Sequence, residues 1–200
     1  MVKTIILDIE TKPNVDLLDA YVSGLKHPAN YKDQKKIDEW YETKRADARK
    51  QMSTDTDLCS IFCVGIKEID EEPLIMGFEQ ACYYLNSDPT QLRFVTYNGK
   101  KFDIPTMIKM SAKLGVELPY FTMVESLRRN GVESHIDLYE ILNVPGDYKK
   151  KDQLVEIYLG KKPTPIDFEN CTDEELREHC KEDLILTEEL YKLFLGKLYL

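Results

Sequence analysis

The 200-residue sequence has no apolar run of the roughly 20 residues that a membrane-spanning helix requires. Its N-terminus also lacks the charged and then apolar leader of a secretory signal, and residues 3–9 already read as a strand. From these absences we expect neither a membrane protein nor a secreted one. We therefore predict a cytoplasmic protein that makes no contact with a membrane.

Cysteine is scarce, and its spacing contains no CxxC pair. An odd number of cysteines argues against a disulfide framework and favours free thiols in a reducing compartment. Two of them, four residues apart on a predicted strand, are expected to fill the core rather than to bind zinc. The five cysteines are Cys59, Cys63, Cys82, Cys171 and Cys180.

Positive charge is also in short supply, because 27 Lys and Arg face 36 Asp and Glu for a formal net charge of -9. An acidic chain repels a polyanion. Any nucleic-acid partner would therefore have to be held by local basic patches and by bound cations.

The chain alternates strand and helix patterns without an internal repeat or a low-complexity tract. An acidic turn joins two of the predicted strands, and a capping box precedes the last predicted helix. This order predicts an α/β single domain over residues 1–200, with a mixed sheet flanked by helices. Strands are expected over 3–9, 58–69, 73–78 and 92–97, helices over 32–52, 79–86, 103–114, 151–159 and 172–195, and an extended segment that turns helical over 135–142.

Residues 31–52 form a charged helical insertion between the first two predicted strands. Ile37, Trp40 and Tyr41 recur at helical spacing and give this helix a narrow apolar stripe. Two interpretations remain open. The stripe either docks the helix on the domain, or the helix is an arm that guides a nucleic-acid strand with its basic residues.

The stretch TIILDIET places two carboxylates, Asp8 and Glu10, one residue apart on a predicted strand. Residues i and i+2 of a strand point to the same face, so the two acids converge and repel. They share a cation, share a proton, or lie at a solvent-exposed strand end.

Further acids recur later in the chain. Asp103 follows the strand at 92–97, in the stretch TYNGKKFD, and Asp183 lies in the last predicted helix. His179 precedes Asp183 by four positions and therefore shares its helix face. Taken singly, each acid is also compatible with a helix-start or solvated position.

In this order, LDIET, YNGKKFD and HCKED resemble the three motifs of the DEDD 3′–5′ exonucleases, over about residues 3–195. The spacing is similar to the proofreading exonuclease domain of family-B DNA polymerases. The resemblance implies a ribonuclease H-like fold and two divalent cations, Mg²⁺ or Mn²⁺. The metal ligands that it implies are Asp8, Glu10, Asp103 and Asp183.

One motif position departs from this pattern, because His179 stands where the family-B type has a tyrosine. By the resemblance, His179 is the group that orients or deprotonates the attacking water. The resemblance also implies substrate contacts, and the candidates beside the motifs are Thr11, Asn98, Phe102 and Lys101.

The resemblance implies hydrolysis of single-stranded DNA to mononucleotides, with DNA favoured over RNA and a DNA polymerase or another replication or repair protein as a possible partner. Two alternatives stay open: a non-catalytic nucleic-acid-binding or accessory proofreading module, and an oligoribonuclease-like RNA exonuclease. Candidate phosphate contacts include Lys149 to Lys151. Aromatic side chains available for base stacking are Tyr97, Tyr120, Phe121 and Tyr148.

Overall fold

The computed structural model describes residues 2–87, 91–128 and 134–195. The chain divides into two compact units, one made of Met1–Glu10 with Phe62–Leu200 and the other of Thr11–Ile61. The prediction of one domain over the whole chain stays a prediction.

Five strands form one mixed sheet in the order β3-β2-β1-β4-β5. Strand β4 pairs in parallel with β1 on one side and with β5 on the other, whereas β2 and β3 form an antiparallel hairpin. This confirms the predicted α/β fold with a mixed sheet flanked by helices. The strands are β1 (Val2–Pro13), β2 (Cys59–Glu68), β3 (Leu74–Met76), β4 (Gln91–Thr96) and β5 (His135–Asp137).

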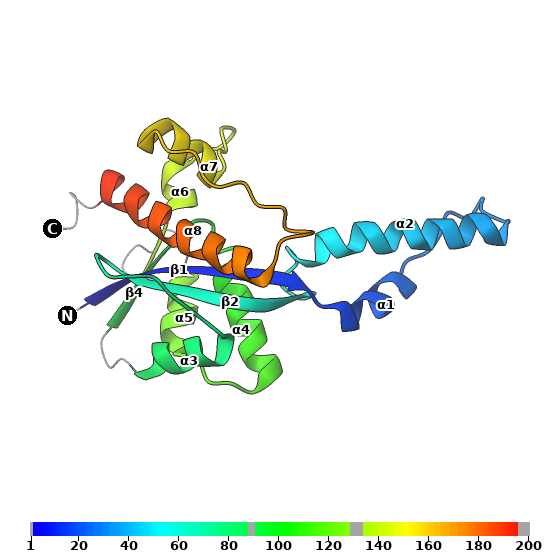
Figure 1. Cartoon of the computed structure of the whole chain (residues 1–200). Helices are drawn as coiled ribbons and strands as arrows, with labels where there is room; N and C mark the ends of the chain where they lie inside the picture. The colour runs from blue at the N-terminus through cyan, green and yellow to red at the C-terminus, as the bar shows by residue number, and fades with distance from the viewer. Residues whose placement is uncertain (1, 88–90, 129–133, 196–200) are drawn as a thin grey trace. The chain divides into compact units, whose positions relative to one another are not determined.

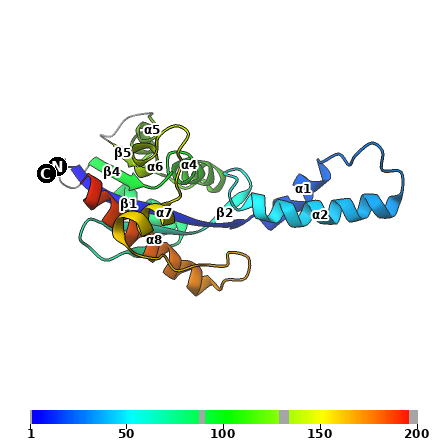
Figure 2. The ribbon, with the colours of Figure 1, turned by 90° about the horizontal axis from the view of Figure 1, so that it is seen from above.

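The helices of the larger unit lie on both faces of the sheet (Figure 1). Helix α8 covers one face, and α3, α4 and α5 lie on the other. Seen from above, α7 lies over α8 (Figure 2), and the π-helical turn that follows α7 contacts α8. These elements are α3 (Phe78–Ser87), α4 (Asp103–Leu114), α5 (Tyr120–Ser126), α6 (Leu138–Leu142), α7 (Lys151–Leu154), the π-helical turn Val155–Leu159, and α8 (Asp173–Phe194).

Helix α8 begins at the predicted capping box, in which Thr172 and Glu175 exchange side-chain and backbone hydrogen bonds. Its inner face carries Leu184 and Leu190, which are fully buried against the sheet residues of the core. The close approach requires a glycine below it, since a Cβ at Gly65 of β2 would lie 2.7 Å from Leu184 Cδ1. The sequence therefore fixes α8 on the sheet through its cap, its leucines and this glycine.

The smaller unit contains α1 (Val15–Ser23) and α2 (Gln34–Met52), the predicted charged helix. Its buried core includes Val22 of α1 and Met52 of α2, and Tyr41 packs against it. The Tyr41 hydroxyl donates to the carbonyl of Leu25 at 3.2 Å, and Trp40 meets the Tyr41 ring edge to face. The apolar stripe thus packs within this unit, and a role in guiding a strand stays a prediction.

Buried His135 of β5 joins three segments of the larger unit. Its Nδ1 lies 3.0 Å from the Ser126 carbonyl and its Nε2 lies 2.8 Å from Thr96 Oγ1. The carbonyl only accepts, so Nδ1 carries the proton and Nε2 accepts from the threonine. Thr96 Oγ1 in turn accepts from the Gly99 amide at 3.1 Å, so this network supports the turn after β4.

We expect this histidine to make the fold sensitive to mild acid. Burial lowers the pKa of His135 to about 3, against an ordinary value of 6.5. Between these values the unfolded chain binds a proton that the folded chain refuses, so stability falls as pH drops from about 6.5 towards 3. From pH 6.5 to 5 the loss is about 2 kcal/mol. Urea unfolding of wild type and His135→Asn at both pH values measures it. An equal change in stability for the two proteins would contradict the assignment.

No helix among residues 2–87, 91–128 and 134–195 has both the length and the apolar character needed to cross a membrane.

Candidate functional site

Three acids of the larger unit meet at the end of the β1–β4 pairing. The last residue pair of that ladder is Ile6 with Val95, and β1 continues past it through Asp8 and Glu10. Beyond the ladder, the Ile9 amide donates to Asp103 Oδ1 of α4 at 3.1 Å. This long-range bond holds the third acid beside the strand that carries the first two.

Helix α8 adds the fourth acid and the histidine. Single ligand atoms of Glu10, His179 and Asp183 all lie within 4.8 Å of one another. The Nε2 atom of His179 is 3.7 Å from Asp183 Oδ2, as expected for residues four apart on one helix. We call Asp8, Glu10, Asp103 and Asp183 the acid cluster.

The acid cluster carries more negative charge than its surroundings stabilise. Burial raises the pKa of Asp8 from 3.8 to about 7, with Lys151 acting against this rise and Asp183 adding to it. Burial and the neighbouring Asp8 raise the pKa of Glu10 to about 10. Burial and Asp8 also raise the pKa of Asp103 well above its ordinary value. These three acids therefore resist ionisation unless cations are supplied.

One cation is built into the site. Lys151, the first residue of α7, forms an ion pair with Asp183, and both side chains are only 12% exposed. Burial alone would lower the pKa of Lys151, but Asp183 and Asp8 raise it above its ordinary value. The sequence pattern included this lysine only among candidate phosphate contacts, because nothing in the spacing shows that α7 lies over α8.

The turn between β4 and α4 positions the second motif. Asp137 accepts from the Asn98 amide at 2.7 Å and from the Lys100 amide at 3.0 Å. Asn98 itself adopts a positive φ of 69°, a conformation that asparagine tolerates better than most residues. Phe102 is half-buried directly before α4, and Lys101 is exposed. Asp137, which the motif comparison did not single out, is the residue that organises this turn.

Thr11 is the first residue of the smaller unit. Its hydroxyl donates to the Ser53 carbonyl at 2.6 Å within that unit. A contact of Thr11 with a terminal nucleotide stays a prediction.

Cys180 of α8 contacts the acid cluster. Its thiol donates to Asp8 Oδ2 at 3.7 Å, and a hydrogen bond with Cys63 together with burial raises the pKa of Cys180. A thiol that keeps its proton can donate to Asp8 without adding charge. Motif spacing gave no signal of this contact, which depends on how α8 lies on β2.

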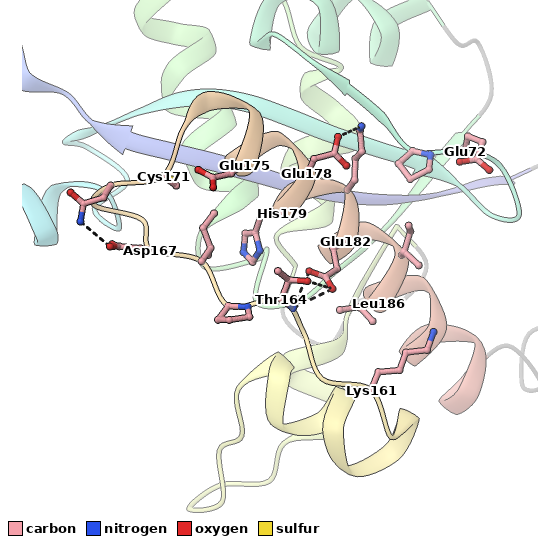
Figure 3. A pocket seen from close by; sticks show the side chains of 16 residues that line it. Glu72, Lys161, Thr164, Asp167, Cys171, Glu175, Glu178, His179, Glu182 and Leu186 are labelled. Atoms are coloured by element: carbon pink, nitrogen blue, oxygen red, sulfur yellow. Dashed lines mark hydrogen bonds and ion pairs between the residues drawn. The ribbon is translucent and has the colours of Figure 1, made fainter.

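A cavity of about 830 Å³ lies on the outer side of α8, between this helix and residues 161–171 (Figure 3). Thr164 hydrogen-bonds to Glu182 through its amide and hydroxyl at 3.1–3.2 Å, and the Phe168 ring meets His179 edge to face at 5.3 Å. Figure 3 shows the His179 imidazole among the lining side chains. Five acids and two lysines line this cavity, so it repels phosphate. Its acids are Glu72, Asp167, Glu175, Glu178 and Glu182.

The donor atoms of the acid cluster fit hard divalent cations. Carboxylate oxygens are the ligands that Mg²⁺ and Mn²⁺ prefer, and four converging acids offer enough charge for more than one ion. The raised pKa values of Asp8 and Glu10 point the same way, because a bound cation would replace the protons. The arrangement can therefore hold metal ions and place them next to His179 and Lys151.

Comparisons with known proteins bear on the fold. No protein-family model matches the sequence, and no curated protein matches it. Among solved structures, the family B DNA polymerase from the hyperthermophilic archaeon Pyrobaculum calidifontis superposes with a TM-score of 0.60 at 15% sequence identity. The match covers 98% of this chain and 25% of that polymerase chain. The chain thus shares its fold with about a quarter of a polymerase.

Proposed function

We propose that this chain is a metal-dependent 3′–5′ exonuclease that hydrolyses phosphodiester bonds of single-stranded DNA and releases mononucleotides. One observation carries the proposal: four acids from β1, α4 and α8 converge on one another beside a histidine. The motif resemblance supplies the polarity, and the structural similarity to a family B DNA polymerase supports a nucleic-acid substrate.

Asp8, Glu10, Asp103 and Asp183 would hold two divalent cations. When bound, these ions supply Lewis-acid stabilisation of the attacking and leaving oxygens of an in-line displacement. Lys151 orients the Asp183 carboxylate through its ion pair. It also places a positive charge where the phosphodiester would arrive.

The Nε2 atom of His179 is the ring nitrogen that faces Asp183 and the acid cluster. Its side chain is 16% exposed and packs against Phe168, so the ring has a defined orientation. Among the described residues, its buried Nδ1 has no hydrogen-bond partner. An imidazole in this position suits the role of orienting or deprotonating the attacking water.

The direct test is a time course on single-stranded DNA and RNA labelled at the 3′ or the 5′ end, with Mg²⁺, Mn²⁺ or EDTA. We expect the 3′ label to appear as a mononucleotide at once, and a 5′-labelled ladder to shorten stepwise. EDTA should abolish both. Preferential cleavage of RNA would favour the RNA exonuclease alternative. Binding without cleavage would favour the accessory module, for which a DNA polymerase is the expected partner.

Replacing the histidine separates catalysis from binding. His179→Ala should lower kcat about 100-fold or more, since general base catalysis contributes about 10²–10⁴-fold, while strand affinity is kept. His179→Tyr restores the residue of the family-B motif and should recover part of the rate. Single-turnover hydrolysis alongside strand binding in EDTA measures both quantities. Equal rates for His, Tyr and Ala would remove this residue from the mechanism.

A further inference from the structure

Three tyrosines of the larger unit form an aromatic ladder. Tyr97 meets Tyr139 edge to face at 5.7 Å, and Tyr139 stacks on Tyr148 at 5.9 Å with an angle of 9° between the rings. The first two are half-buried, whereas Tyr148 is 60% exposed. We call this set the tyrosine ladder. Its outermost ring presents an aromatic surface to solvent.

Hydrogen bonds connect the tyrosine ladder to the segment that precedes α7. The Tyr97 hydroxyl donates to the Lys149 carbonyl at 2.5 Å and accepts from Asn143 Nδ2 at 3.3 Å. Asn143 Oδ1 accepts from the Lys149 amide at 2.7 Å. The segment that carries Tyr148 is therefore fixed on both sides of residue 149. Tyr148 thus projects from a backbone held by hydrogen bonds and stacks on Tyr139, which lowers the conformational entropy lost on binding a ligand.

The ladder is continuous with the proposed catalytic centre. Tyr148 precedes Lys151 by three residues, and Lys101, whose Nζ lies 4.9 Å from the Tyr139 ring centre, precedes Asp103 by two. At about 3.3–3.6 Å per residue, no more than about 11 Å of backbone separates Tyr148 from Lys151, the ion-pair partner of Asp183. A strand with one phosphodiester in the cluster would pass the ladder within a short distance.

Lysines gather around the ladder. Residues 97–101 and 139–151 contain five lysines, of which Lys151 already pairs with Asp183 of the acid cluster. The two acids of these segments also pair with lysines, Glu140 with Lys100 and Asp147 with Lys149. Lys101 and Lys150 are exposed. An exposed ring among lysines suits a ligand that combines flat bases with phosphates.

We propose that Tyr148 is a stacking platform for one unpaired base of a nucleic-acid strand, near the nucleotide whose phosphodiester enters the acid cluster. The proposal rests on the proposed function and adds to it the side chain that binds a base of the single strand, since a paired base is already stacked in its duplex. The competing possibility is that Tyr148 only covers Tyr139.

Strand affinity measured in EDTA tests the platform without hydrolysis. Stacking on an aromatic side chain contributes enough that Tyr148→Ala should weaken binding of a single strand of about ten nucleotides by about 5- to 100-fold. Tyr148→Phe should retain affinity because it keeps the ring. Tyr83→Ala is the matched control, since Tyr83 is 78% exposed in α3 of the same unit. Tyr148→Leu keeps an apolar cover over Tyr139 and should lose affinity as the alanine variant does.

Strands that lack a single base give the decisive comparison. Removing the base at one particular position near the 3′ end should weaken binding to wild type, yet cost nothing further in Tyr148→Ala. The platform would be overturned if Tyr148→Ala lost the same affinity for intact strands as for abasic strands at every position. Full affinity in Tyr148→Leu would also overturn it. If the base-dependent affinity requires Tyr148 but labelled strands are not hydrolysed, the stacking platform stands and the proposed exonuclease activity is wrong. If labelled strands are hydrolysed but the affinity does not depend on Tyr148 and the base together, the exonuclease stands and the platform is wrong.

Discussion

Asp8→Asn should reduce hydrolysis by about three orders of magnitude or more, because metal ions supply several kcal/mol of transition-state stabilisation and each 1.4 kcal/mol is tenfold. Asp8 is the acid that shares neighbours with all the others: the pKa values of Glu10 and Asp103 both respond to its charge, and its own pKa responds to Asp183. Losing it should weaken every metal position that the cluster offers.

The same substitution should stabilise the metal-free protein. The pKa of Asp8 is about 7 in the fold and about 4 when unfolded. Between these values the folded chain keeps a proton that the unfolded chain releases, so stability falls as pH rises through this window. An asparagine does not ionise, and it removes up to about 4 kcal/mol of this loss at pH 8. Added Mg²⁺ should reverse the order, since only wild type keeps the full ligand set.

Two measurements check the predicted loss of hydrolysis and the predicted gain in metal-free stability. Hydrolysis of a 3′-labelled strand in Mg²⁺ gives the rate, and urea unfolding in EDTA at pH 5 and pH 8 gives the stability. Glu156→Gln, which removes an exposed carboxylate beyond α7, is the control and should change neither. A metal-free Asp8→Asn that is less stable than wild type at pH 8 would show that the carboxylate makes favourable contacts in the fold.

The sequence predicted most of the elements because local signals marked them. The hairpin of β2 and β3, the helix opening at Asp103, and the capping box at Thr172 all occur where expected. Helix α5 was not predicted. Its N-cap position is Pro119, which makes no side-chain cap bond, so the usual start signal is missing.

The four acids could be grouped from their motifs, but their setting could not. The bond from the Ile9 amide to Asp103 joins residues 94 positions apart, and the contact of Cys180 with Asp8 joins residues 172 apart. Such contacts depend on how helices lie on the sheet, which periodicity does not encode. The ion pair of Lys151 with Asp183 has the same origin, and it changes the electrostatics of the whole cluster.

Removing that lysine should have the largest effect on stability. Lys151→Met keeps most of the side chain's volume but leaves Asp183 and Asp8 without their buried cation. Breaking a buried pair by removing one partner costs about 3–5 kcal/mol. We expect the loss in EDTA at pH 8, where Asp8, whose pKa is about 7 in the fold, is ionised. It should shrink at pH 5, because a protonated Asp8 no longer requires a positive neighbour.

The affinity for divalent cations should rise in this variant, whereas its metal-free stability falls. In wild type the ammonium group already satisfies part of the negative charge that a divalent ion would meet. Lys151→Met should therefore bind Mg²⁺ or Mn²⁺ more tightly, and saturating metal should recover much of the lost stability, since a ligand that binds only the folded state stabilises it. Calorimetric titration with Mn²⁺ and urea unfolding with and without the metal measure the two effects.

Lys149→Met supplies the matched control two residues away. Lys149 pairs with Asp147 at a site where that carboxylate is 65% exposed, and such surface pairs contribute about 0–1 kcal/mol. Its replacement should leave both stability and metal affinity close to wild type, whereas Lys151→Arg should behave as a charge-preserving variant. If Lys151→Met and Lys149→Met lose the same stability and bind metal alike, Lys151 is an ordinary surface lysine and the acid cluster tolerates its own charge.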